Sequence, residues 1–253
     1  MGRITNLTKK FRNRDLVFGF TTSILDPNVL RGYARDGVDF ILFDLEHGSI
    51  SGEMIAPYLD ICRKLDIPTI VRVQDAMYHL IAKQIDMGAD GILLPRTETL
   101  EQVRTAIDAV RFPPIGRKGC GGANQWRKGE SVSEFQVGRS ILIQIESPKG
   151  IENLPAILST YGNEIAAVII GPYDMSFLSG APLDIHGEVV TGNIMKVIEI
   201  CGECKTSCGI YCDDLSLAKK WRERGMNVLW TASDVSLLAS GVSSALQFAE
   251  DLK

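Results

Sequence analysis

The sequence predicts an α/β protein, a (β/α)8 TIM barrel that residues 1–253 form as a single domain. Eight short apolar runs that are typical of buried strands follow one another, and each precedes a segment with helical periodicity. The 253 residues, 45% of them apolar, are enough for eight such units around one core. A doubly wound open sheet is the competing architecture, but the first strand lacks the Gly-x-Gly-x-x-Gly turn of a dinucleotide site.

The predicted strands are near-continuous runs of Ile, Val and Leu bounded by Gly, Pro or Asn, as in a parallel sheet covered on both faces. They span residues 16–21, 40–44, 69–73, 91–95, 141–146, 166–170, 209–212 and 227–231. The predicted helices carry apolar residues at intervals of three and four, which gives each of them one buried face. They span residues 28–35, 52–65, 77–87, 100–110, 149–159, 188–204, 215–224 and 235–252.

The longest irregular stretch, residues 112–130, follows the fourth predicted helix. It either enters the fifth strand from the far end of the barrel or crosses back over the top. Its Gly and Arg content suits an anionic substrate, and it equally suits a mobile solvated loop.

Composition excludes several functional classes. A formal net charge of −4 without a block of like charges gives no electrostatic footprint for nucleic acid or an anionic membrane surface. No apolar run approaches the roughly 20 residues that a membrane helix needs, and the first residues lack a signal-peptide core. We expect a soluble cytoplasmic protein that binds a small molecule.

Four of the six cysteines fall within residues 201–212, which superficially resembles a zinc or iron–sulfur ligand run. Ile194, Val197 and Cys201 share one helix face, however, and Cys204 continues that stripe. Cys212 lies at the end of the next strand. We therefore favour core packing over a metal cluster and expect free thiols in a reducing compartment.

Two neighbouring strands each lead to a carboxylate, Glu146 after the fifth and Asp174 after the sixth. The carboxyl ends of adjacent parallel strands meet at one edge, so two hard oxygen donors there suit a divalent cation with positions left open for substrate. A structural interpretation is equally open: Glu146 caps the helix that begins near Pro148, and Asp174 closes a turn.

Other strand ends supply further polar groups, namely Asp44, Glu46, His47, Arg72, Arg96 and Gln144. Barrel enzymes keep their chemistry at this rim. His47 is a better general-base candidate than His79, which lies in a predicted helix, or His186, which lies in a loop.

These segments together resemble the class II pyruvate-dependent aldolases of the HpcH/HpaI type, the family that includes 2,4-dihydroxyhept-2-ene-1,7-dioate aldolase. The resemblance covers nearly the whole chain and is carried, beside Arg72, by residues 39–48, 83–89, 111–119, 144–146 and 170–176. It implies a barrel of the phosphoenolpyruvate/pyruvate type and a carbon–carbon lyase. Such an aldolase cleaves or forms a 4-hydroxy-2-oxo acid, to or from pyruvate and an aldehyde, through a metal-stabilised pyruvate enolate.

The resemblance also implies roles for residues. Glu146 and Asp174 would hold the metal, which is Mg²⁺ or Mn²⁺ with Co²⁺ as a substitute, while Arg72 and Gln144 would bind the pyruvate oxygens. The backbone of Gly171, Pro172, Tyr173 and Asp174 would grip the carboxylate. The family pairs the histidine with an aspartate on the third predicted helix, here His47 with Asp86, to form a base. It further implies a homohexamer.

The chain departs from the family at Arg96, at Tyr173 and at residues 120–126, which lie where the aldehyde half would be recognised. Arg96 either contacts substrate, pairs with Glu98 or Glu46, or points to solvent. Two other functions stay open. One is an acyl-CoA lyase of the citramalyl-CoA or malyl-CoA type, and the other is a non-catalytic barrel that binds a 2-oxo acid.

Overall fold

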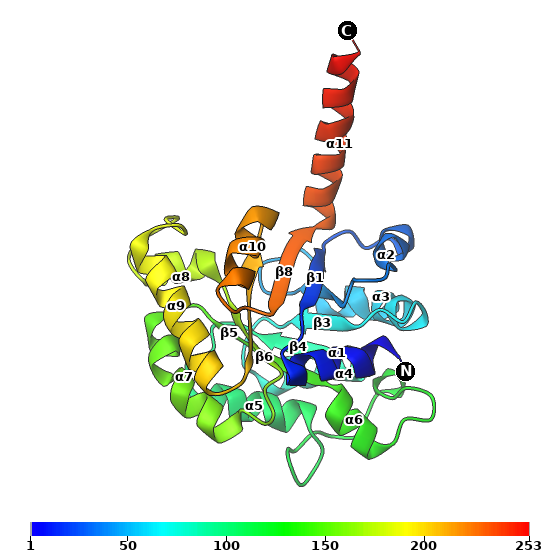
Figure 1. The fold of residues 1–253 in the computed structure, drawn as a ribbon. Coiled ribbons are helices and arrows are strands. Elements are labelled where there is room, and N and C mark those ends of the chain that lie inside the picture. The colour runs from blue at the N-terminus through cyan, green and yellow to red at the C-terminus, as the bar shows by residue number, and fades with distance from the viewer. Residues whose placement is uncertain (1, 253) are drawn as a thin grey trace.

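The computed structural model describes residues 2–252 and confirms the predicted barrel (Figure 1). Eight parallel strands close on themselves in sequence order, β1 pairing with β8. They are β1 (Val17–Thr22), β2 (Phe40–Asp44), β3 (Thr69–Arg72), β4 (Gly91–Leu94), β5 (Ser140–Ile145), β6 (Ala167–Ile170), β7 (Ser207–Cys212) and β8 (Val228–Ser233). Each lies within a few residues of its predicted position.

The helices alternate with the strands. Those that the periodicity predicted are α2 (Pro27–Tyr33), α3 (Gly52–Lys64), α4 (Tyr78–Met87), α5 (Leu100–Val110), α7 (Pro148–Tyr161), α9 (Glu188–Glu203), α10 (Leu215–Glu223) and α11 (Asp234–Asp251). The prediction missed α1 (Arg3–Asn13), α6 (Val132–Gly138), α8 (Pro172–Leu178) and the short turn η1 (Ala123–Gln125). Among residues 2–252, no helix combines the length and apolar character needed to cross a bilayer.

Side chains that point into the barrel form one of the two apolar cores. Because alternate residues of a strand face the same side, Leu42, Ile70 and Leu142 fill the interior together. Leu7 and Phe11 of α1 belong to the same core, so α1 closes the amino-terminal end of the barrel. The larger core lies between the strands and the surrounding helices.

The same alternation decides which polar residues reach the rim at the strand carboxyl ends. Asp44 stands two residues after Leu42, Arg72 two after Ile70, and Gln144 two after Leu142. Their side chains therefore continue the inward-facing rows above the apolar layer.

The last helix departs from the expected outer ring. α11 extends away from the barrel (Figure 1), and Asp234 in its first turn is its single buried residue within the described range. Its exposed apolar side chains are Val235, Leu237, Leu238, Val242, Leu246 and Phe248. An amphipathic sequence predicts a helix but does not specify what covers its apolar face.

The irregular segment 112–130 packs along α4 and beneath the amino-terminal end of the barrel. Arg127 Nη2 lies 2.7 Å from Asp90 Oδ1 just before β4, and Gly119 N donates to the Tyr78 hydroxyl at 2.9 Å. The sequence left two routes open for this segment, and it enters β5 from the amino-terminal end of the barrel rather than crossing over the strand carboxyl ends. Within one chain, residues 120–126 therefore lie away from the strand carboxyl ends.

The cysteine prediction is right for three of its four residues. Cys201 on α9 and Cys208 and Cys212 on β7 are buried, and burial raises the pKa of the Cys212 thiol to about 12. Cys204 is exposed, which corrects its assignment to the buried stripe. α9 ends at Glu203, so Cys204 no longer follows the helical face.

Candidate active site

Arg72 is the centre of the polar group at the rim. Its Nε donates to Asp44 Oδ1 at 2.8 Å and its Nη2 to Asp44 Oδ2 at 2.6 Å, a two-point pair that the register of Asp44 beside Arg72 sets up. The guanidinium also lies 5.4 Å from the Trp230 ring centre. Burial would raise the pKa of Asp44, but the hydrogen bonds and charge of Arg72 hold it below its usual value.

The Glu46 carboxylate is buried and lies beside two guanidinium groups and the His47 imidazole. Its oxygens lie 3.2 Å from Arg72 Nη1, 3.2 Å from Arg96 Nε and 3.7 Å from His47 Nε2. Despite these charges, burial raises the pKa of Glu46, and its Oε2 has no hydrogen-bond partner among the described residues. Arg72 Nη1 is 3.2 Å from this oxygen, so Oε2 is held by an ion pair rather than by a well-formed hydrogen bond.

Glu146 lies deepest in the site. Its Oε1 accepts from the Arg96 backbone N–H and its Oε2 from Gln144 Nε2, both at 2.8 Å. Burial, together with the charges of Asp174 and Glu46, raises its pKa to about 7. The capping interpretation of Glu146 is wrong, because Ser147 is the cap of α7 and accepts from Gly150 N.

Gly171, at the end of β6, leaves room for this carboxylate. A Cβ at Gly171 would overlap Glu146 Oε2 and lie 2.6 Å from Gln144 Nε2, so a larger residue would displace both side chains. Pro172 begins α8 and has no N–H, and the amides of Tyr173 and Asp174 in the first turn have no acceptor within the helix.

Asp174 and His47 complete the group from the solvent side. Asp174 is 42% exposed and lies in the first turn of α8, and His47 Nε2 is 3.9 Å from its Oδ2. The His47 side chain is 57% exposed, and its backbone N–H donates to Asp44 Oδ1 at 3.4 Å. The described residues thus bring His47, Asp174, Glu146, Arg72 and Gln144 to one rim, although they lie on separate segments of the chain.

Asp86 does not join them within one chain. It lies near the end of α4, where the ammonium group of Lys118 pairs with its carboxylate. The neighbouring carboxylates of His47 are Glu46 and Asp174. The pairing of His47 with Asp86 therefore stays a prediction that contacts within the chain do not support.

Arg96 serves the site in two ways. Its backbone holds Glu146 and takes a left-handed conformation with φ of 43°. Its side chain is 60% exposed and pairs with Glu46. The sequence analysis left open whether this guanidinium contacts substrate, pairs with Glu98 or Glu46, or points to solvent. In the structure it pairs with Glu46.

Sequence reasoning missed three residues at this rim, Tyr211, Asp213 and Trp230. The Tyr173 hydroxyl donates to Asp213, which follows β7, and this bond raises the pKa of Tyr173. Tyr211 of β7 packs on Trp230 of β8, with ring centres 4.7 Å apart. Extending the survey of strand ends to the seventh and eighth strands would have found these residues.

The donor set agrees with a divalent cation that the protein holds with few ligands. Residues 2–252 contain no cluster of three or more His, Cys, Asp or Glu side chains with the geometry of a complete metal site. Glu146 and Asp174 are hard oxygen donors, and burial, together with the charges of Asp174 and Glu46, raises the pKa of Glu146. A bound divalent cation would favour the charged form of this carboxylate.

Comparison with known proteins adds to this geometry. The profile of the HpcH/HpaI aldolase/citrate lyase family matches residues 20–240. The 2-keto-3-deoxy-L-rhamnonate aldolase of Salmonella typhi is 29% identical over 245 residues, which cover 93% of this chain and 89% of that protein.

Two crystal structures share the whole architecture. The HpcH/HpaI aldolase from Desulfitobacterium hafniense DCB-2 superposes with a TM-score of 0.87 at 25% identity, covering 98% of this chain and 97% of that one. A HpcH/HpaI aldolase/citrate lyase family protein from Burkholderia cenocepacia J2315 superposes with a TM-score of 0.88 at 23% identity, covering 97% of this chain and 99% of that one. The two proteins share the fold.

Proposed function

Because the chain belongs to the HpcH/HpaI aldolase/citrate lyase family, we propose that it is a metal-dependent aldolase that joins or separates pyruvate and an aldehyde. The product or substrate is a 4-hydroxy-2-oxo acid. The observation that carries the proposal is the buried carboxylate of Glu146, which lies beside Gln144 and Arg72 and shares the rim with Asp174.

Glu146 and Asp174 would hold the metal, with Mg²⁺ or Mn²⁺ suited to their oxygen ligands and Co²⁺ as a substitute. When bound, a divalent cation withdraws electrons from the 2-oxo acid and so lowers the cost of negative charge on its keto oxygen. Gly171 keeps the space in which Glu146 and Gln144 meet.

Arg72 and Gln144 would bind the pyruvate part. Arg72 Nη1 points between Gln144 Oε1, at 3.5 Å, and Glu46 Oε2, at 3.2 Å, whereas Nε and Nη2 are held by Asp44. Asp44 thus fixes the guanidinium plane and leaves Nη1 for a substrate oxygen. The amides of Tyr173 and Asp174 after Pro172 are free to receive the carboxylate.

His47 would move the proton of the C4 hydroxyl. Its ring is exposed at the rim, 3.7 Å from Glu46 Oε2 and 3.9 Å from Asp174 Oδ2, where it could take up a proton from a substrate hydroxyl. The role of Asp86 as its orienting partner is tested by Asp86→Asn, which should lower kcat and leave the affinity for metal unchanged.

Arg96 and Tyr173 would face the aldehyde half. Both side chains are exposed at the rim, and each is tied to one carboxylate, Glu46 or Asp213. An acceptor with carboxylate or several hydroxyl groups suits such a surface. The Salmonella protein is named for a hydroxylated sugar acid, which supports an acceptor that carries a hydroxyl group.

The test is pyruvate release from a panel of 4-hydroxy-2-oxo acids, followed with a coupled lactate dehydrogenase. Activity should disappear with a chelator and return with Mg²⁺, Mn²⁺ or Co²⁺. Undiminished turnover in metal-free protein would rule out the mechanism. Release of acetyl-CoA from malyl-CoA or citramalyl-CoA, measured separately, would indicate the lyase instead, and binding of pyruvate without turnover would indicate a non-catalytic barrel.

We also propose a homo-oligomer in which a second copy covers α11. The exposed apolar side chains of this helix, and an apolar cavity of about 380 Å³ at its base lined by Phe20, Tyr33 and Leu237, are a surface of the kind that subunits bury. A hexamer is the expected assembly. Sedimentation of Leu246→Glu/Phe248→Glu should show a smaller species than the unaltered chain, and an unchanged assembly would contradict the proposal.

A further inference from the structure

A polar cavity of about 600 Å³ opens at the amino-terminal end of the barrel, opposite the candidate active site. Ser140, Ala166 and Ser207, at or beside the starts of β5, β6 and β7, form its floor, and the ends of α7 and α9 form its walls. The apolar interior of the barrel separates it from the rim. The proposed aldolase reaction uses none of its residues.

The lining of this cavity is strongly cationic. It contains Arg12, Arg111, Arg139 and Lys205 against one carboxylate, Glu164. Arg111 Nε pairs with Glu164 at 2.7 Å, and Arg139 pairs at 2.8 Å with Glu130, which lies outside the lining. Four cations against two carboxylates leave a formal charge of +2, carried by Arg12 and Lys205.

Several donors in the cavity have no partner. Among the described residues, no carboxylate pairs with Arg12 or Lys205, and no hydrogen bond engages the side chains of Asn163 or Ser140. Arg111 uses Nε for Glu164 and Nη1 for the Arg139 carbonyl, at 2.8 Å, so its Nη2 is unengaged. Free guanidinium, ammonium, amide and hydroxyl donors thus line one cavity.

Arg111 cannot turn to solvent for compensation, because its side chain is only 7% exposed. Burial lowers its pKa, and although Glu164 opposes this, the charges of Arg139 and Arg12 lower it further. A buried guanidinium with two cationic neighbours and one carboxylate favours an anion.

A structural explanation competes with this one. The cavity lies at helix ends where carbonyl groups carry partial negative charge, and cations are favoured there. That effect falls off within one turn and requires no enclosed space, hydroxyl group or amide donor. It therefore explains the presence of basic residues but not their convergence on a cavity.

We propose that this cavity binds a small molecule that carries a phosphate group. A phosphate bears about −1.5 to −2 charges near pH 7, which matches the charge left by Arg12 and Lys205. Its three oxygens can accept from Arg111 Nη2, Asn163 and Ser140, and a volume of about 600 Å³ leaves room for the organic part.

The experiment uses inorganic phosphate as the probe and Cys204 as the reporter. Cys204 is exposed and lines the cavity, whereas Cys120 is exposed elsewhere. Phosphate at millimolar concentration should slow alkylation of Cys204 at least five-fold and leave Cys120 unchanged, measured by peptide mass spectrometry against chloride at equal ionic strength. Equal rates at Cys204 in both salts would overturn the proposal.

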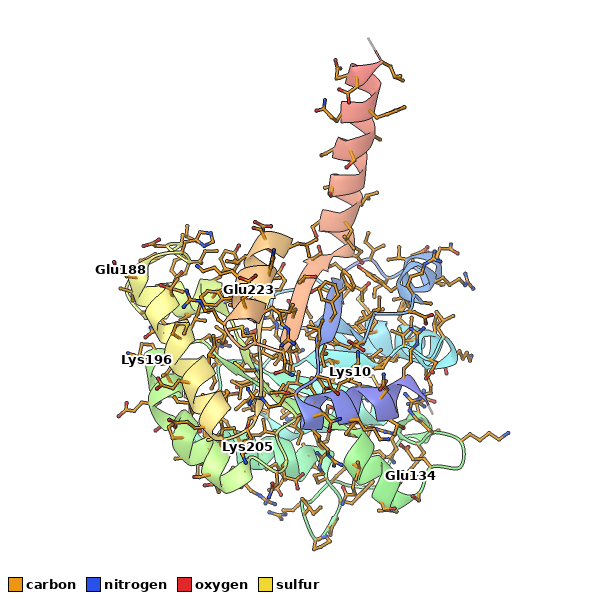
Figure 2. All side chains as sticks on the ribbon, in the orientation of Figure 1. Lys10, Glu134, Glu188, Lys196, Lys205 and Glu223 are labelled. Atoms are coloured by element: carbon orange, nitrogen blue, oxygen red, sulfur yellow. The ribbon has the colours of Figure 1, made fainter. Side chains whose placement is uncertain are left out.

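Matched double variants locate the effect. Arg12→Ser/Lys205→Ser removes the two unpaired cations, and Lys196→Ser/Lys219→Ser removes the same charge from exposed positions outside the lining. Lys196 and Lys205 lie along and just beyond α9, only the second beside the cavity (Figure 2). The first variant should weaken phosphate protection at least ten-fold and the second less than two-fold.

Equal weakening in the two double variants would reduce the effect to general surface charge and so refute the site. Asn163→Asp provides a second variant that changes no cation. It places a negative charge in the cavity and should weaken protection as strongly as the double variant. Protection unaltered by Asn163→Asp would also contradict the proposed position of the anion.

Discussion

Replacing Glu146 by Gln should abolish activity and at the same time stabilise the metal-free protein at alkaline pH. The pKa of Glu146 is about 7 in the folded protein, against a usual value of 4.5. Because the folded-state pKa is the higher one, the contribution of this group to stability is fully present below pH 4.5 and is lost as pH rises through 7. At about 1.4 kcal/mol per pKa unit, the loss is about 3 kcal/mol.

The amide introduced by Glu146→Gln carries no charge, so the variant does not lose stability as pH rises through 7. Its NH2 group, however, must face a donor, either the Arg96 N–H or Gln144 Nε2. That mismatch costs about 1–2 kcal/mol. The variant should therefore be less stable than the unaltered protein at pH 5 and more stable by about 1–2 kcal/mol at pH 8.

The assay is urea unfolding with a chelator at pH 5, 6, 7 and 8, at one protein concentration because subunit association contributes to stability. Asp174→Asn is the matched control: its carboxylate is 42% exposed, so activity should fall without a change of sign in the stability difference. If Glu146→Gln shows the same stability difference at every pH, the inferred burial of charge at Glu146 is wrong.

Three further predictions concern the neighbours of Glu146. Arg72→Lys keeps the charge but loses the two-point bond to Asp44, so kcat/KM should fall at least about 100-fold in a folded protein. Kinetics like those of the unaltered enzyme would exclude a role of Arg72 in binding the pyruvate oxygens. Arg96→Met should lower kcat/KM by about 1–3 kcal/mol for carboxylated or polyhydroxylated acceptors and spare small neutral aldehydes, and a uniform loss across the panel would refute a role in specificity. Gly171→Ala should weaken metal binding, measured by titration calorimetry, because the added Cβ would overlap Glu146 Oε2. Gly192→Ala is the control, since a Cβ there meets nothing within 4 Å and should leave the metal affinity unchanged. Equal metal affinities of the two variants would contradict the proposed position of the ligand.

Much of the fold and part of the site follow from local patterns. Strand alternation fixes which side of a strand faces inward, so the placement of Arg72 and Gln144 at one rim follows once Ile70 and Leu142 are assigned to the core. The family resemblance is confirmed by the profile match. Residues 1–253 as one domain, the roles of the site residues and the metal itself stay predictions.

Other features depend on contacts distant in sequence. The partner of Asp86 is Lys118, 32 residues further on and in a segment without periodicity, so no local signal identifies it. Asp213 was overlooked because the predicted strand ends one residue before it, and its bond to Tyr173 spans 40 residues. The direction of α11 is a property of tertiary packing, which an apolar stripe alone does not encode.

Because the Arg96 backbone, and not its side chain, donates to Glu146, the side chain at position 96 can change without loss of this hydrogen bond. The proposed metal ligand is held by a main-chain N–H, which every residue except proline provides, and the side chain at the same position is the one that we propose to face the aldehyde. If that proposal holds, mutation at position 96 would alter which aldehyde is accepted without removing the N–H that holds Glu146. The left-handed backbone conformation at position 96, with φ of 43°, limits which residues can replace Arg96 and favours Asn, Asp or Gly. Within those limits, substitution at this one position would change the preferred aldehyde while the proposed metal site stays fixed.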